Sequence, residues 1–337
     1  MVRFTSPTLS IWKRLNQLHE QEILFQFTGL TMTTALTPKD LPPPPPGKTG
    51  WPWTRQSKLL PEKMSDGCEW PRLSIVTPSY NQGKFLEATI RSVLLQGYPN
   101  LEYIIIDGGS TDNSVETIKK YDKYLFYWHS KKDRGQADAI NQGLEKSSGE
   151  ILGWINSDDV YVKGSFYKIV KAFHSHPDYI VVHGNRILIN ERGEVTGWMC
   201  LPPFDPKTLL YNVCSETAFW QRTAMKQAGL INANLQFAID LEFFGRLYKY
   251  GKFLKLNDYL GYFRCHSENK SSTIAYVGQE EAAREWRRLF GSENMKTELK
   301  ENKNWLHFLK LTTDLIKQPS LLGFPYLLQR FSKGSSD

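Results

Sequence analysis

The sequence predicts an α/β protein with a single, mainly parallel sheet that is flanked by helices. Between residues 71 and 275, short apolar segments alternate with segments whose apolar residues recur at helical spacing. The apolar segments are nearly continuous, as in strands that are buried on both faces. Three of them end in polar clusters, and such sheets bind ligands at the carboxyl ends of their strands. We therefore expect a Rossmann-like sheet with a binding site along one edge.

The first half of this region supplies the strands and helices on which the prediction depends. Four apolar segments are expected to be strands: Leu73–Thr77, Leu101–Ile106, Leu125–Trp128 and Ile151–Ile155. Three segments have one apolar face and are expected to be helices: Lys84–Leu95, a segment that starts after a cap at Asp112 or Asn113 and buries Val115 and Ile118, and Gln136–Lys146.

Both ends of the chain differ from this central region. Residues 1–70 contain the proline run Pro42–Pro46, which favours polyproline II and cannot join the interior of a sheet. We expect an N-terminal arm, with a modest amphipathic helix at 11–27, followed by a Pro-rich linker; a docking ligand is the alternative. Residues 276–337 show helical apolar spacing with interspersed basic residues and predict a helical C-terminal extension. This extension either packs on the core or contacts a membrane surface through residues 303–333.

The net charge and the cysteines limit which partners and which cellular compartment are expected. The net charge of +7 suits phosphate groups, nucleic acid or an anionic membrane, but no zinc-finger or RRM-like signature accompanies it, so nucleic acid is not expected. The four cysteines form no C-x-x-C pair or disulfide pattern, which fits a reducing compartment. We see no signal peptide and no apolar run of about 18 residues. A cytoplasmic location, at or near the inner face of the cell membrane, is therefore expected.

Polar clusters follow three of the predicted strands and are expected to meet at one edge of the sheet. They are Thr77–Asn81, Asp107–Asp112 and Asn156–Asp159. Adjacent carboxylates such as Asp158 and Asp159 are costly at the end of a buried strand, unless a divalent cation offsets their repulsion. The alternative is that Asp158 caps a helix beginning near residue 163 or 164. Three aligned clusters favour the cation site.

Taken in order, four motifs resemble the large family 2 of inverting glycosyltransferases, which have the GT-A fold. They are P-x-Y-N at 78–81, a D-D-G-S-x-D-like turn at 107–112, A-x-N-x-G at 139–143 and a D-x-D-type motif at 156–159. Each motif is weak alone, but their order and spacing are specific. The resemblance implies a GT-A domain at 71–275, with a nucleotide-sugar-binding half at 71–160 and an acceptor half at 161–275.

The resemblance also implies roles for individual residues on the donor side. Tyr80 would stack on the nucleobase, Asp107 would contact the nucleoside and Arg134 would contact the donor phosphates. The full set of implied nucleotide-sugar-binding residues is Thr77, Pro78, Tyr80, Asn81, Asp107, Arg134, Asn156 and Asp158. The implied cofactor is Mn²⁺ or Mg²⁺, which would neutralise the leaving diphosphate. Its implied ligands are Asp158, Asp159 and His266, although a hydrogen-bonded loop position is the alternative for the histidine.

An inverting transferase needs a carboxylate that deprotonates the acceptor hydroxyl. The resemblance places this base at Asp240, with Glu242 as the alternate. A plain helix N-terminal acid, favoured by the helix dipole, is the competing interpretation of Asp240. Glu216 is a further carboxylate that could line the sugar pocket, and Arg264 could pair with the diphosphate.

Together with the resemblance, these features predict a metal-dependent inverting glycosyltransferase. It would move a sugar from a nucleoside-diphosphate donor, with a UDP-sugar favoured, to a saccharide or lipid-linked saccharide in surface polysaccharide biosynthesis. Two departures from the family pattern, Gly108 for the second Asp of the turn and Asn156 for the first Asp of the metal motif, favour a non-catalytic nucleotide-sugar-binding protein as the alternative. A Rossmann oxidoreductase is disfavoured because no G-x-G-x-x-G follows the first strand.

Overall fold

The computed structural model describes residues 35–206 and 213–291 of the chain. The helix expected at 11–27, and the residues 303–333 for which membrane contact was considered, lie outside the described residues. None of the helices in the described part combines the length and the apolar character that crossing a membrane requires.

The described elements alternate between strand and helix in the first half and become more irregular in the second. The strands are β1 (Leu73–Ser79), β2 (Leu101–Asp107), β3 (Tyr127–Ser130), β4 (Ile151–Trp154), β5 (Val160–Tyr161), β6 (Tyr179–Ile189), β7 (Val195–Met199), β8 (Ala218–Gln221) and β9 (Lys252–Arg264). The α-helices are α2 (Gly83–Leu94), α3 (Ser114–Lys120), α4 (Gln136–Lys146), α5 (Ser165–Ser175), α6 (Arg222–Ala228), α7 (Ile239–Leu247), α8 (Lys270–Thr273) and α9 (Ala275–Phe290).

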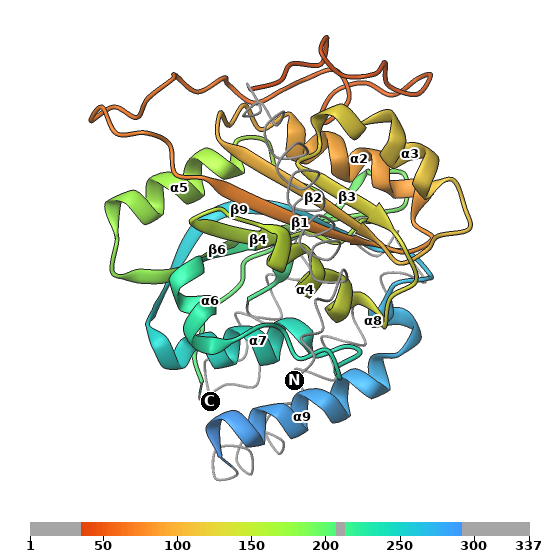
Figure 1. Ribbon diagram of the computed structural model, residues 1–337. Coiled ribbons are helices and arrows are strands. Elements are labelled where there is room, and N and C mark those ends of the chain that lie inside the picture. The colour runs from red at the N-terminus through yellow and green to blue at the C-terminus, as the bar shows by residue number, and fades with distance from the viewer. Residues whose placement is uncertain (1–34, 207–212, 292–337) are drawn as a thin grey trace, which may run out of the picture.

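These strands form one sheet in the order β3-β2-β1-β4-β8-β6-β9-β5, and β7 pairs with β6 (Figure 1). The four strands of the first half are all parallel, as the sequence predicts. The second half is mixed: β8 is antiparallel to both of its neighbours, whereas β6 and β9 are parallel to each other. The predicted α/β fold is confirmed, with antiparallel pairing added in the second half.

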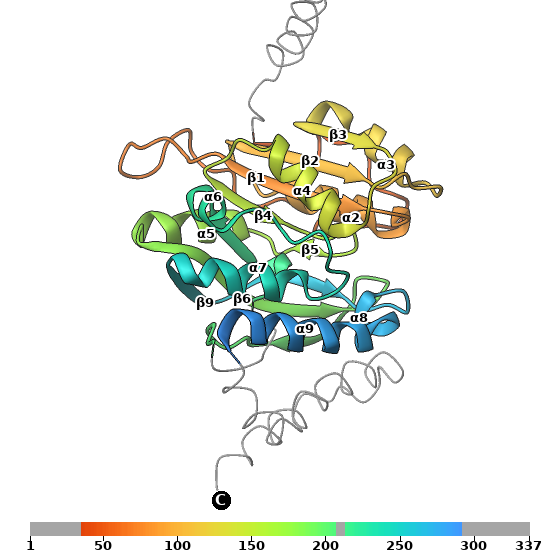
Figure 2. The same ribbon diagram turned by 60° about the horizontal axis from the view of Figure 1, so that its bottom comes forward.

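A hydrophobic core lies on each face of the sheet, which explains why the strands appear in the sequence as continuous apolar runs. On β1, Ile75 points into the core beneath α2, α3 and α5, while Val76 points into the core beneath α4, α6 and α7. Both side chains are fully buried, and full burial of such a side chain stabilises the fold by roughly 1.5–3 kcal/mol. Helix α9 lies outside α7 and packs against it through Trp286 (Figure 2). The start of the predicted C-terminal extension therefore packs on the core, whereas the rest of it, 292–337, lies outside the described residues.

Most predicted boundaries agree with the structure to within two residues. Helix α4 has the predicted bounds, whereas β3 begins at Tyr127, two residues later than predicted. At the start of α3, the Oδ1 atom of Asp112 accepts the Ser114 N–H (2.9 Å) while its Oδ2 accepts the Gly83 N–H at the start of α2 (2.9 Å). Asp112 thus joins the first turns of two helices and fixes the loops that follow β1 and β2.

The described part of the N-terminal region lies along the domain rather than away from it (Figure 1). Arg91 on α2 is fully buried and donates hydrogen bonds to the backbone carbonyls of Pro42 (2.8 Å), Pro52 (3.2 Å) and Trp53 (2.7 Å). Leu41 is buried in the core on the same side of the sheet. A proline has no backbone N–H to donate, but its carbonyl can still accept a hydrogen bond. Arg91 therefore holds this proline-containing segment against α2.

Candidate functional site

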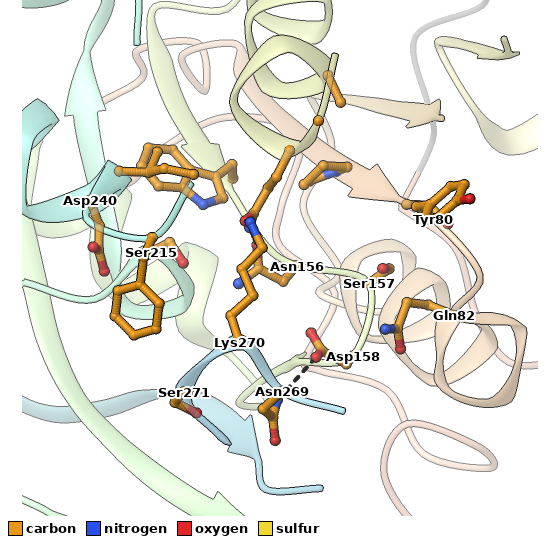
Figure 3. Close-up of a pocket in the computed structure, with 18 of the residues that line it drawn as sticks. Tyr80, Gln82, Asn156, Ser157, Asp158, Ser215, Asp240, Asn269, Lys270 and Ser271 are labelled. Carbon is orange, nitrogen blue, oxygen red and sulfur yellow. Dashed lines mark hydrogen bonds between the residues drawn. The ribbon is translucent and has the colours of Figure 1, made fainter. Parts of the chain in front are cut away.

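A cavity of about 860 Å³ opens where the carboxyl ends of the parallel strands meet the second half of the domain. Its walls come from the loops after β1, β2, β3 and β4, from β6, and from the first turns of α7 and α8. In Figure 3, Tyr80 and Gln82 lie at one end, Asp240 and Ser215 lie at the other, and Asn156 and Lys270 lie between them. The expected edge of the sheet is therefore the wall of an elongated pocket.

The Tyr80 end of the cavity is shaped by the end of β1. Pro78 and Tyr80 both line the cavity, and the Tyr80 side chain is 61% exposed, which leaves its ring free to stack on a flat ligand. Thr77, in contrast, is fully buried, and its hydroxyl is hydrogen-bonded to the Tyr103 hydroxyl (3.0 Å). Thr77 therefore supports this end of the cavity from behind the wall.

Asn81 and Asp107 hold the two loops at this end in place. Asn81 has a positive φ of 52° and bridges to the neighbouring loop: its N–H donates to Ser110 Oγ and its Oδ1 accepts the Thr111 N–H, both at 2.8 Å. Asp107 is fully buried, and its carboxylate accepts hydrogen bonds from the Ser110 N–H (2.9 Å) and the Ser130 hydroxyl (2.6 Å). Neither side chain lines the cavity. The carboxylate that was expected to contact a nucleoside instead closes the turn.

Arg134, expected to contact donor phosphates, lies in a different position. Its side chain is 80% exposed and forms an i,i+4 ion pair with Asp138 on α4 (2.7 Å). It is not part of the cavity wall. The first turn of α4 contributes Gln136 instead, whose Nε2 donates to Asn156 Oδ1 (2.6 Å).

The loop after β4 carries the two adjacent carboxylates into different surroundings. Asp158 lines the cavity, and its Oδ2 lies 3.3 Å from Asn269 Nδ2 (Figure 3). The same oxygen lies 3.0 Å from Nε2 of His266, which is buried and does not itself line the cavity. Asp159 is fully buried, and its Oδ1 accepts the Arg264 N–H (2.9 Å). Burial, with the neighbouring charges of Asp158 and Glu216, raises the pKa of Asp159. Asp158 does not cap α5, because Gly164 occupies the position before that helix.

Asp158, which lines the cavity, and His266, which is buried and contacts it, are the two side chains suited to a divalent cation. A carboxylate oxygen and an imidazole nitrogen are both acceptable donors to Mn²⁺, and they already lie within 3.0 Å of each other. In residues 35–206 and 213–291, no group of three or more His, Cys, Asp and Glu side chains is arranged to hold a metal. The donors fit such an ion, provided that a bound ligand supplies the rest of its coordination.

At the opposite end, Asp240 stands in the first turn of α7 and lines the cavity. Its Oδ1 accepts the Leu241 N–H (2.9 Å), which leaves Oδ2 available to a ligand. Burial raises the pKa of Asp240 to about 6, despite the opposing Leu241 hydrogen bond and the charge of Arg186. A carboxylate with such a pKa is ionised at neutral pH and is basic enough to accept a proton.

Glu242, the alternate base in the sequence analysis, faces away from the cavity. Its side chain is 2% exposed and forms ion pairs with Arg246 on α7 (2.9 Å) and Arg288 on α9 (2.6 Å). Both of its oxygens are occupied by charged donors. Of these two acids, Asp240 alone reaches the cavity.

Two cationic side chains in the cavity wall were missed by the sequence analysis. Arg186 on β6 lines the cavity and forms an ion pair with the buried Glu216 (2.7 Å). Glu216 does not line the cavity itself and contacts it only by holding the arginine. Lys270 on α8 lines the wall near Asn156 and donates to Gln136 Oε1 (2.6 Å) and the Gln236 carbonyl (2.8 Å). No local motif marks either residue, since each is brought to the site by sheet pairing and loop packing. With Lys132 they are the cations of a cavity wall that also carries four carboxylates, those of Asp133, Asp158, Asp240 and Glu268.

Arg264, in contrast, is a buried structural residue. Its guanidinium donates to the backbone carbonyls of Asp158 (2.7 Å) and Asn190 (3.1 Å), and it lies over the Phe85 ring. It does not line the cavity, but it holds the loop that carries Asp158.

Comparison with known proteins identifies the family that this sequence matches. Residues 74–217 match the family described as Glycosyl transferase family 2. An uncharacterized glycosyltransferase of Rickettsia conorii is 36% identical over 125 residues, which is 36% of this chain and 20% of that protein. TuaG of Bacillus subtilis, whose name assigns it to teichuronic acid biosynthesis, is 35% identical over 101 residues, which is 29% of this chain and 40% of TuaG. The matches thus span less than half the length of these curated relatives.

Two solved structures share the fold at low sequence identity. TarS 1–349 of S. aureus, in complex with UDP-GlcNAc, superposes with a TM-score of 0.51 at 18% identity, covering 74% of this chain and 72% of that one. The mannosyltransferase PcManGT of Pyrobaculum calidifontis, in complex with GDP-Man and Mn²⁺, gives a TM-score of 0.52 at 16% identity, covering 79% and 80%. The similarity extends beyond the matched family segment into the second half of the domain.

Proposed function

We propose, on the premise that the chain belongs to glycosyl transferase family 2, that it is a metal-dependent inverting glycosyltransferase. It would transfer a sugar from a nucleoside-diphosphate donor to a saccharide or lipid-linked saccharide. One observation carries the proposal: a single cavity holds an exposed Tyr80 at one end, Asp158 along its wall and Asp240 at the other end, and the buried His266 contacts Asp158. This order matches the order of base, diphosphate, sugar and acceptor in such a reaction.

We assign the donor to the Tyr80 side of the cavity. The Tyr80 ring would stack on the base, and the diphosphate would lie between Asp158 and Lys270. A divalent cation bound there would neutralise charge on the departing nucleoside diphosphate. Asp158 and His266 would be its protein ligands, whereas Asp159, with its carboxylate held by the Arg264 N–H, would support the loop. Burial lowers the pKa of Lys270, but the charges of Glu281 and Asp158 oppose this shift.

Asp240 is the proposed general base. It would accept the proton of the acceptor hydroxyl at Oδ2, while the Leu241 N–H holds Oδ1 and orients the carboxylate. Inversion requires this proton to be removed on the side of the sugar opposite the leaving diphosphate. Asp240 and Asp158 lie at separate places along the cavity, which supports that arrangement (Figure 3).

The relatives suggest a class of product. TuaG is named for teichuronic acid biosynthesis, and the two structural neighbours carry UDP-GlcNAc and GDP-Man. We therefore propose a role in the biosynthesis of a cell-surface polysaccharide with a uridine or guanosine diphosphate sugar as donor. A cytoplasmic location near the inner face of the membrane stays a prediction, since the segment considered for membrane contact lies outside the described residues.

A panel of nucleotide sugars tests this proposal in two stages. A donor that binds the native protein raises its melting temperature by mass action, and this shift is expected to grow when Mn²⁺ is added. Release of nucleoside diphosphate on addition of saccharide acceptors then separates a transferase from a protein that only binds nucleotide sugars. Binding without release under all acceptors tested would support the binding protein, and absence of any metal-dependent shift would refute both.

A further inference from the structure

Asp133 lies on the loop between β3 and α4 and lines the Tyr80 end of the cavity. Its Oδ1 accepts the Gly135 N–H (2.8 Å), which fixes the carboxylate relative to the first turn of α4. Within the described residues, Oδ2 accepts no hydrogen bond. One oxygen of this carboxylate is therefore anchored and the other is available to a ligand.

The same carboxylate occupies the space beside Gly108 in the turn after β2. A Cβ atom built on Gly108 would lie 2.8 Å from Asp133 Oδ2 and 3.1 Å from Oδ1. A side chain at 108 would therefore push the Asp133 carboxylate out of its present position. The glycosyltransferase pattern has an Asp at this position of the turn, and here an acid from another loop fills the place beside it.

We propose that Asp133 is the base-reading residue of the donor site and selects nucleobases that present an N–H on the edge facing it. A carboxylate only accepts hydrogen bonds. It can pair with the N3–H of uracil or the N1–H of guanine, whereas cytosine N3 and adenine N1 are acceptors and would oppose its lone pairs. The proposal rests on the proposed function and extends it to the choice of donor base.

The expected preference among nucleotides follows from the free energy lost when a base presents no N–H to the Asp133 carboxylate. A hydrogen bond to a charged group contributes enough to alter affinity by about tenfold to a hundredfold. A site built around such a bond rejects a ligand that lacks the donor, because the acceptor is covered by the bound ligand and left unpaired. Wild-type protein is therefore expected to bind UDP or GDP at least about tenfold more tightly than CDP and ADP.

Calorimetric titration with UDP, GDP, CDP and ADP in the presence of Mn²⁺ tests the proposal. In D133N, one carboxamide oxygen can still accept the Gly135 N–H, so the loop is expected to stay folded while an N–H₂ group replaces the free oxygen. The preference for UDP or GDP over CDP is then expected to fall by about tenfold or more. Glu145→Gln, an exposed carboxylate on α4, is the matched control and is expected to leave all four affinities unchanged.

A swap of the two positions separates a recognition role from a structural one. Gly108→Asp combined with Asp133→Gly removes the clash and returns a carboxylate to the turn, so the base preference lost in D133N is expected to reappear. If D133N keeps the wild-type ratio of CDP to UDP affinity, or if the swap fails to restore a ratio that D133N has lost, the assignment of Asp133 is wrong. If wild-type protein binds none of the four nucleotides, the proposed function itself fails.

Discussion

The Asp158 carboxylate and the His266 imidazole are 3.0 Å apart although 108 residues separate them in the sequence. The first lies on the loop after β4 and the second lies just beyond β9, on the far side of the sheet order. Phe85 on α2 packs against the imidazole with a ring-centroid distance of 4.8 Å, which fixes the ring in place. The proposed cation site therefore joins the two halves of the domain.

Asp158→Asn is expected to remove most of the Mn²⁺ dependence of donor binding. The substitution keeps the shape of the side chain but removes the negative charge that a hard cation prefers. Titration of UDP in Mn²⁺ and in EDTA checks this, and the ratio of the two affinities should fall by about tenfold in the variant, the loss that follows from one charged contact.

Asp159→Asn is the matched comparison for that measurement. Its amide oxygen can still accept the Arg264 N–H, so the loop should hold and the Mn²⁺ response should resemble the wild type. A lost response in Asp159→Asn with a retained response in Asp158→Asn would reverse the roles that we assign to the two acids.

Asp240→Asn is expected to leave donor binding intact and to lower kcat by about 10²–10⁴, the usual contribution of a general base. In the wild type, kcat/KM should rise with pH and level off above about 6, because only the ionised carboxylate accepts the proton. Steady-state rates between pH 4.5 and 8 measure both effects. Unchanged turnover in the variant would place the base elsewhere.

The same substitution is expected to stabilise the fold at neutral pH. The pKa of Asp240 is about 6 in the folded state, against an ordinary value of 3.8. Between these values the folded state binds more protons than the unfolded state, so stability falls as pH rises through this window. The cost above pH 6 is about 2–3 kcal/mol, and Asp240→Asn should recover it. Urea unfolding at pH 4 and pH 7.5 checks this: the two proteins should differ at pH 7.5 and converge at pH 4.

Gly143→Ala is expected to destabilise the contact between α4 and β1. A Cβ atom at this position would lie 2.3 Å from Val76 Cγ1, so the helix or the strand must shift. Overpacking costs about 1–3 kcal/mol and exceeds the smaller gain in helix propensity. Urea unfolding should give a lower free energy of unfolding, with Glu145→Ala on the same helix as control.

A double-mutant cycle identifies the cause. If the steric clash is responsible, Gly143→Ala should cost less in a Val76→Ala background than in the wild type. Equal costs in both backgrounds would show that the clash is not the source of the loss.

Arg91→Met is expected to release the described N-terminal segment from the domain. The substitution leaves the carbonyls of Pro42, Pro52 and Trp53 without their shared donor. Loss of these buried charge-assisted bonds should cost about 2–4 kcal/mol. Hydrogen exchange of amides in 35–70 should quicken more than exchange in β1 and β2; equal changes in both would indicate global destabilisation instead.

Local sequence patterns specify the parallel half of the sheet and the edge at which the candidate site lies. Both signals are local. A strand that is buried on both faces appears as a continuous apolar run, such as Leu101–Ile106, and polar residues directly after the run indicate where the strand ends. The assignments of Tyr80, Asp158 and Asp240 to the site depended on motif order, and all three residues line the cavity.

Tertiary packing selects which side chains within the motifs face the cavity. Asp107 and Asp158 are both strand-end acids, yet one closes a turn and the other enters the cavity. Arg186, Lys270 and Asp133 reach the site through strand pairing and loop packing between distant segments. The direction of a side chain depends on neighbours that are remote in the sequence, and no local pattern of residues specifies those contacts.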